Sequence, residues 1–255
     1  MAEYGDWLAA IRHSHERMSA LVGGLSADQA GLRSYADEWT VAQVASHLGS
    51  QAEIFDLFLT AGLAGADAPD GDVFTPIWDR WNAMPPAAQL AGSVVANGRL
   101  LERFSGLTPE QQESFTLPLF GTDMDLADLA AARLGEHALH TWDMAVALDP
   151  AATLAPDAVA LLIDTLPTMA ARAGLPVPGA DPVSVAVTDP DRAFDLTLDP
   201  AVTLTPRDGG GPAGATFPAE AFIRLVAGRL DADHTPLGAD AGDRLDQLRQ
   251  AFPGF

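Results

Sequence analysis

Residues 134–143 read LGEHALHTWD, and they bring Glu136, His137 and His140 together on one predicted helix. The chain has only six histidines, so their grouping with a carboxylate calls for an explanation. An α-helix turns about 100° per residue, which puts Glu136 about 40° from His140 on one side and His137 about 60° from it on the other. Either pair could chelate a metal, and the spacing alone leaves both pairs open.

This segment belongs to the last of four long amphipathic helices that the sequence predicts. Apolar residues recur with a period near that of an α-helix in all four, which are expected at about 6–22, 41–61, 87–105 and 125–148. Thr40 and Gln43 form a capping box at the start of the second helix, and Asp123 or Asp125 caps the fourth. Four such helices in succession indicate a bundle, which can hold metal sites between facing helices. Residues 63–84 are expected to be irregular.

A third histidine, His47, lies on the second helix near its apolar face, beside Val44 and Leu48. A buried imidazole needs a partner for each ring nitrogen. A backbone carbonyl is the ordinary partner, and a metal is the alternative. His47, Glu136 and His140 would supply two nitrogens and one oxygen, a usual ligand set for a catalytic zinc with one open position.

The pattern changes after Asp149 and Pro150. A helix is expected at about 156–173, followed by the alternating segments PVSVAVTD and AFDLTLD, which predict a β-hairpin. AVTLTP adds a third strand, GGGPAGATF is expected to be a loop, and helices follow from Pro218 to about 229 and over 240–251. The sequence therefore predicts an α+β chain with two domains, residues 1–150 and residues 151–255.

Composition excludes several function classes. The formal net charge is −21, with 14 arginines and no lysine, so a nucleic-acid partner is not expected. The absence of lysine removes Schiff-base chemistry and the P-loop lysine. There is no cysteine either, so any thiol in the chemistry must be a separate molecule.

The same composition sets the expected location of the protein. No apolar run reaches the roughly 18 residues of a membrane span, and the start of the chain, MAEYGDWLAA, lacks the features of a secretory signal. We therefore expect a cytoplasmic protein without a membrane partner. The strong negative charge favours a monomer.

The residues also carry a resemblance to a known family. WTVAQVASHL at 39–48, followed by GEHALHTWD at 135–143, resembles the mycothiol-dependent maleylpyruvate isomerase family of the DinB-like helical-bundle superfamily. LVAGR at 225–229 and the terminal FPGF resemble the smaller domain of that family, which is similar to sterol carrier proteins. The resemblance implies an N-terminal DinB-like four-helix bundle and a C-terminal α+β sterol-carrier-like domain.

The resemblance also implies roles for individual residues. The metal ligands of the family fall on His47, Glu136 and His140, which leaves His137 without a ligand role. The arginine of the second domain that faces the active site falls on Arg229, with Arg224 as its rival.

An acidic residue of the family pattern falls on Asp143, which would support a ligand or pair with an arginine. Trp39 and Trp142 are expected to be packing residues.

The implied activity is metal-dependent chemistry with an exogenous low-molecular-weight thiol. The metal is expected to be zinc and the thiol mycothiol. The enzyme would isomerise the cis double bond of a maleylpyruvate-like substrate or transfer the thiol to a small electrophile, and a small anionic or electrophilic substrate is its expected partner. The alternative is a non-catalytic ligand-binding or regulatory protein that keeps the metal-binding bundle.

Overall fold

The computed structural model describes residues 2–36, 38–119, 121–208 and 211–254. The chain forms two compact units, Met1–Ala158 and Val159–Phe255. The sequence places the domain boundary near residue 150, whereas the units divide within helix α8 (Pro156–Leu162).

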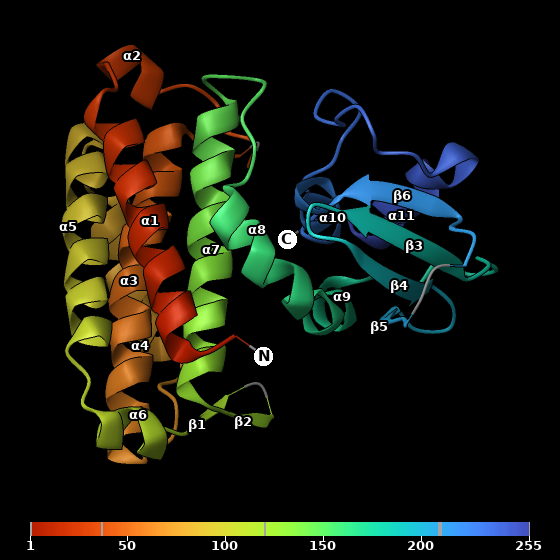
Figure 1. Cartoon of the computed structure of the whole chain (residues 1–255). Coiled ribbons are helices and arrows are strands. Elements are labelled where there is room, and N and C mark those ends of the chain that lie inside the picture. Colours follow the sequence, from red (N-terminus) through yellow and green to blue (C-terminus); the bar gives the residue numbers. More distant parts are fainter. Residues whose placement is uncertain (1, 37, 120, 209–210, 255) are drawn as a thin grey trace. The chain divides into compact units, whose positions relative to one another are not determined.

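Four long helices build the first unit (Figure 1). They are α1 (Tyr4–Gly23), α3 (Val41–Ala64), α5 (Pro86–Ser105) and α7 (Leu126–Val146). Helices α3 and α1 each pack against both α5 and α7, which is the arrangement of a four-helix bundle. The structure confirms the four predicted helices, with ends that differ from the expected ones by a few residues.

Side-chain caps fix the starts of the two helices that carry the candidate site. The Gln43 backbone N–H donates to Thr40 Oγ1 at 3.3 Å, and the Thr40 N–H donates to Gln43 Oε1 at 2.8 Å. At α7 the Asp128 N–H donates to Asp125 Oδ1 at 2.8 Å. Each cap satisfies an N–H group that the helix itself leaves free.

The expectation of an irregular segment over residues 63–84 is wrong, because α4 (Gly71–Asn82) lies within it. Pro76 lacks the N–H of its helical hydrogen bond, and this residue, with the Gly and Asp around it, hides the helix in the sequence. Trp81 anchors α4 to α3: a Cβ on Gly49 would lie 2.2 Å from the Trp81 ring, so only glycine accepts this packing.

Shorter elements complete the first unit. They are α2 (Ala27–Ala30), α6 (Pro109–Ser114) and a two-stranded hairpin of β1 (Leu117–Leu119) and β2 (Thr122–Met124). The core is apolar and includes Leu48, Leu59, Phe104 and Leu129, all fully buried.

The second unit contains a four-stranded mixed sheet in the order β5–β4–β3–β6. The strands are β3 (Val183–Thr188), β4 (Arg192–Thr197), β5 (Thr203–Pro206) and β6 (Ala215–Pro218). Strand β4 runs antiparallel to β3 and β5, and β6 runs parallel to β3. The predicted hairpin and third strand are confirmed, as is the α+β class.

Two expectations for this unit need correction. Residues 215–217 are not loop but belong to β6, a parallel strand too short to show a clear alternation; Gly209 and Gly210 of the same segment lie outside the described residues. The helix expected over 156–173 is interrupted by a 3-10 turn at Ile163–Thr165, because Pro167 cannot donate a helical hydrogen bond.

The remaining helices of this unit are α9 (Leu166–Ala173), α10 (Ala219–Val226) and α11 (Leu245–Ala251), with a 3-10 turn at Gly242–Arg244. Phe222 of α10 lies 5.6 Å, between ring centroids, from Phe217 of β6, and both are buried. Within the described residues, no helix combines the length and the apolar character that crossing a bilayer requires.

Candidate metal centre

Helices α3 and α7 bring His47, Glu136 and His140 together. One ligand atom from each side chain lies within 4.8 Å of the other two. His47 Nε2 is 3.3 Å and His140 Nε2 is 3.6 Å from the same oxygen, Glu136 Oε2. The spacing in the sequence allowed either Glu136 or His137 to share a metal with His140. In the structure, Glu136 and His140 lie at the same site.

The donor set fits a divalent metal. Zinc–ligand bonds of about 2.0–2.2 Å at tetrahedral angles place neighbouring ligand atoms about 3.3 Å apart, close to the spacings to Glu136 Oε2. The Glu136 side chain is 40% exposed, and those of His47 and His140 are 20% and 13% exposed. A set of three protein ligands, which are partly exposed here, is typical of catalytic rather than structural zinc sites.

Asp143 orients one of the candidate ligands. Its buried carboxylate accepts a hydrogen bond from His140 Nδ1 at 2.8 Å, one turn further along α7. This bond places a proton on Nδ1, so Nε2 is the ring nitrogen that faces Glu136 and His47. Such a carboxylate–histidine pair is the usual support of a metal-bound imidazole.

The electrostatics of the site keep the ligands in their binding forms. Burial, the largest effect, lowers the pKa of His47, so its imidazole is neutral at pH 7. Partial burial works to raise the pKa of Glu136, but the hydrogen bond from His47 and the nearby His140 and Arg133 outweigh it and lower the pKa to about 2. A neutral imidazole and an ionised carboxylate are the forms that bind metals.

Trp39 lies against the candidate ligands. Its ring centroid is 5.0 Å from that of His47 and 6.3 Å from that of His140. Trp142 is buried elsewhere: its indole N–H donates to the Ala152 carbonyl at 2.8 Å, and its ring packs on Tyr35. The expected packing role fits Trp142, whereas Trp39 forms one wall of the site.

His137 has a different environment from its neighbour Glu136. It is 1% exposed, and its Nδ1 lies 2.8 Å from the Ser14 hydroxyl of α1. Burial lowers the pKa of His137 well below 6.5, so the ring is neutral. His137 is thus a buried residue of the α1–α7 contact.

The two arginines considered for the second unit differ clearly. Arg224 is buried and donates two hydrogen bonds to Glu220, at 2.8 and 2.9 Å, and one each to the Arg229 and His234 carbonyls. These contacts make Arg224 a structural residue. Arg229 is half-buried, and its Nη1 donates to the Ala227 carbonyl at 2.8 Å.

A close backbone contact fixes the turn before Arg229. Gly228 has a φ of 70°, and a Cβ there would lie 2.2 Å from Gly254 Cα. The LVAGR and FPGF segments therefore meet through two glycines. Phe255 lies outside the described residues.

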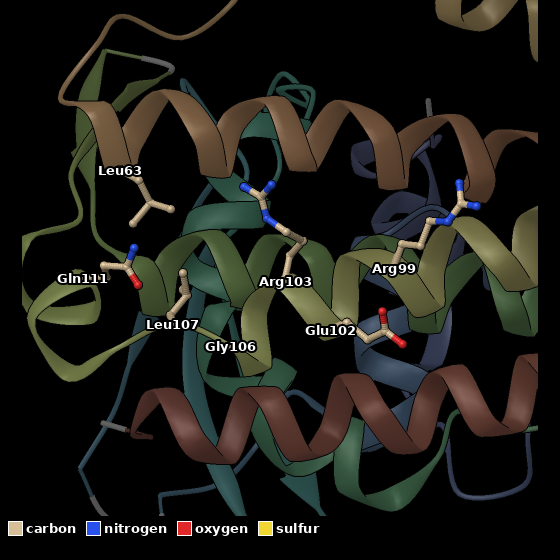
Figure 2. A pocket seen from close by; sticks show the side chains of 7 residues that line it. All are labelled: Leu63, Arg99, Glu102, Arg103, Gly106, Leu107 and Gln111. Carbon is tan, nitrogen blue, oxygen red and sulfur yellow. The ribbon is translucent and has the colours of Figure 1, made fainter.

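A surface groove of about 500 Å³ lies on the first unit, and Figure 2 shows the side chains that line it. It is lined by Leu63, Arg99, Glu102, Arg103, Gly106, Leu107 and Gln111. None of these residues belongs to the His47–Glu136–His140 group. Arg103 is held by Asp56 at 3.4 Å, and Arg99 is exposed.

Sequence reasoning missed one polar residue next to the site. Arg133, one turn before Glu136, is 1% exposed and is the largest fully buried side chain among the described residues. Arginine is rarely buried in this way. Only its position three residues before Glu136 could have pointed to it.

Fold and site together define a helical-bundle protein with a histidine–glutamate–histidine donor set between two facing helices. Residues 11–145, more than half of the chain, match the mycothiol maleylpyruvate isomerase N-terminal domain, and the chain belongs to this family.

The fold is also similar to a solved structure. The crystal structure of the mycothiol-dependent maleylpyruvate isomerase, and that of a histidine-to-alanine mutant, each superpose with a TM-score of 0.62. This chain is 16% identical in sequence to each of them, and each match covers 89% of this chain and 90% of the chain in the crystal structure. No curated protein sequence matches the chain.

Proposed function

We propose that this protein is a metal-dependent enzyme that uses an exogenous low-molecular-weight thiol. The observation that carries the proposal is the convergence of His47, Glu136 and His140, whose ligand atoms lie within 4.8 Å of one another. The set would hold one divalent cation, for which zinc is the best fit by ligand type.

The protein residues would each have a defined task. A bound cation supplies Lewis acidity, which keeps a coordinated thiol in its thiolate form near pH 7. His47, Glu136 and His140 would hold that cation. Asp143 keeps the proton of His140 on Nδ1, and Trp39 limits the site on one side.

The thiol must come from outside because the chain contains no cysteine. The family suggests mycothiol as that thiol. A thiolate adds to one carbon of an electron-poor cis double bond, and the electron pair moves onto the conjugated carbonyl oxygen as an enolate. Rotation about the new single bond and expulsion of the thiolate give the trans isomer. If the adduct is protonated and released, the same addition is an S-transfer.

We assign the binding of the substrate carboxylate to Arg229. The arginine of the family's second domain falls on Arg229, and a guanidinium matches a carboxylate through paired donors. This role agrees with the sterol-carrier-like second domain that the family resemblance implies. We further propose that the enzyme acts as a cytoplasmic monomer on small molecules, which size-exclusion chromatography and cell fractionation can test.

The test combines metal analysis with a product assay. Purified protein should contain about one zinc ion per chain, and it should isomerise maleylpyruvate or form thiol conjugates with small electrophiles when mycothiol is added. The variant His47→Ala should lose both properties, whereas His13→Ala, a histidine of the α1 surface, should keep them. A zinc-loaded wild type that turns over no substrate of the panel would favour the non-catalytic binding or regulatory alternative.

A further inference from the structure

Arg133 is a buried cation inside the bundle, on α7 one turn before Glu136. Burial lowers its pKa to about 10, so it stays charged at pH 7. In the described part of the chain no carboxylate forms an ion pair with it, and its Nη1 has no hydrogen-bond partner there. Taking an arginine out of water costs several kcal/mol, and this environment offsets that cost only in part. Stability alone therefore gives no account of an arginine here.

The contacts of Arg133 join three helices. Its Nη2 donates to the Leu48 carbonyl of α3 at 3.3 Å and to Asn97 Oδ1 of α5. The guanidinium carbon lies 5.3 Å above the centre of the Phe55 ring of α3. Asn97 Nδ2 donates to the same Leu48 carbonyl at 3.3 Å.

The carbonyl that receives these hydrogen bonds belongs to the residue directly after His47. One of its two donors is Arg133, which lies one turn before Glu136 on α7, and the other is Asn97 of α5. A buried link of two side chains thus connects the backbone beside one candidate ligand with the helix that carries the other two. Since a mutual shift of α3 and α7 would change the distance between His47 and Glu136, the link bears directly on the ligand spacing.

We propose that Arg133 is a positioning residue of the metal centre, which sets the separation of α3 and α7 so that His47 and Glu136 can bind the same cation. This inference rests on the proposed function, because it assumes that the site binds a metal. Arg133 itself touches neither metal nor substrate.

The experiment measures zinc affinity and metal-free stability side by side. The variants are Arg133→Met, which keeps the length of the side chain without its donors, and Arg133→Lys. Arg99→Met is the matched control, an exposed arginine of α5 (Figure 2). Zinc affinity is measured by competition with a chromophoric chelator, and the Tm of the metal-free protein is measured by circular dichroism. The absorption spectrum of the cobalt-loaded protein reports the ligand geometry.

We expect Arg133→Met to weaken zinc binding about 10- to 100-fold, as loss of supporting residues does at other metal sites. The Tm of its metal-free form should stay within a few degrees or rise, because replacing a buried charge by an apolar side chain is often neutral or stabilising. The cobalt spectrum should change as well. Arg133→Lys should bind zinc with intermediate affinity, and Arg99→Met like the wild type.

The outcomes distinguish a failure of the proposed function from a failure of the role assigned to Arg133. A wild type that binds no zinc refutes the proposed function. If the wild type binds zinc and Arg133→Met binds it equally tightly with the same cobalt spectrum, only the role of Arg133 is refuted. A fall in affinity that appears only together with an equal loss of metal-free stability also refutes that role. If Arg133→Met does not fold, Arg133→Lys decides, and wild-type affinity in this variant overturns the inference.

Discussion

Glu136 and His137 are neighbours on α7, yet they belong to two different polar groups. Glu136 is 40% exposed and faces His47 of α3, whereas His137 is 1% exposed and bonds to Ser14 of α1. A step of about 100° around the helix separates them. A polar cluster in the sequence therefore divides according to which neighbouring helix each side chain meets.

The largest expected effect is the difference in zinc content between variants of the two faces of α7. We expect His140→Ala to abolish zinc binding, because two ligands remain, whereas folded His137→Ala keeps about one zinc ion per chain. Elemental analysis of both purified variants measures this difference. Retention of zinc in His140→Ala together with its loss in His137→Ala would reverse the assignment of the faces.

The second prediction concerns stability on the buried face. His137→Ala should lower the free energy of unfolding by about 2–4 kcal/mol, because it leaves a cavity and removes the partner of the Ser14 hydroxyl. Urea unfolding of the metal-free proteins measures the change. His140→Ala is the comparison and should lower the free energy of unfolding by less, since its ring lies at the partly exposed candidate site. Equal losses of stability in the two variants would contradict the distinction between the two faces.

The third prediction tests the hydrogen bond by which Asp143 orients His140. Asp143→Asn keeps the size of the side chain but loses the charge that holds the His140 proton, and we expect zinc affinity to fall about 10-fold or more. Chelator competition at pH 7 measures it. Wild-type affinity in this variant would show that Asp143 has a packing role alone.

The smallest effect is a dependence of stability on pH. Burial first, and the charge of Arg133 next, lower the pKa of His137 well below its ordinary value of 6.5. Below pH 6.5 the unfolded chain therefore binds a proton that the folded chain does not, and the free energy of unfolding falls with falling pH.

One such group contributes a slope of up to about 1.4 kcal/mol per pH unit. Urea unfolding of metal-free protein between about pH 7 and about pH 5 measures the slope. His137→Gln, which cannot titrate, should show a slope smaller by about this amount. The same slope in wild type and variant would contradict the buried neutral state of His137.

The bundle was predictable because each of its four helices shows long amphipathic periodicity, and the second and fourth also begin at recognisable caps, the Thr40–Gln43 box and Asp125. Helix α4 was not, since Pro76 and the glycines around it are typical of loops and the helix depends on tertiary contacts, such as the packing of Trp81 on Gly49 and the hydrogen bond from the Trp81 indole to Glu53. Strand β6 was missed because four residues carry too little alternation.

The composition of the candidate site was predictable from the residues themselves, whereas its orientation, with Glu136 and not His137 beside His47, followed only from the family resemblance. The spacing of Glu136, His137 and His140 left two pairs open, and the position of Ser14, more than a hundred residues earlier, decides between them. The burial of Arg133 was not predictable, because arginine is ordinarily a surface residue and the contacts that bury this one come from two other helices.

The contact between Gly228 and Gly254 has a consequence for how the chain acquires its structure during synthesis. The turn before Arg229 has hydrogen bonds of its own, from the Gly228 and Arg229 N–H groups, but the backbone that packs on it is made 26 residues later. Until Gly254 has emerged from the ribosome, this turn lacks its packing partner. A chain that stops short of Gly254 would therefore leave the turn before Arg229 without this packing partner.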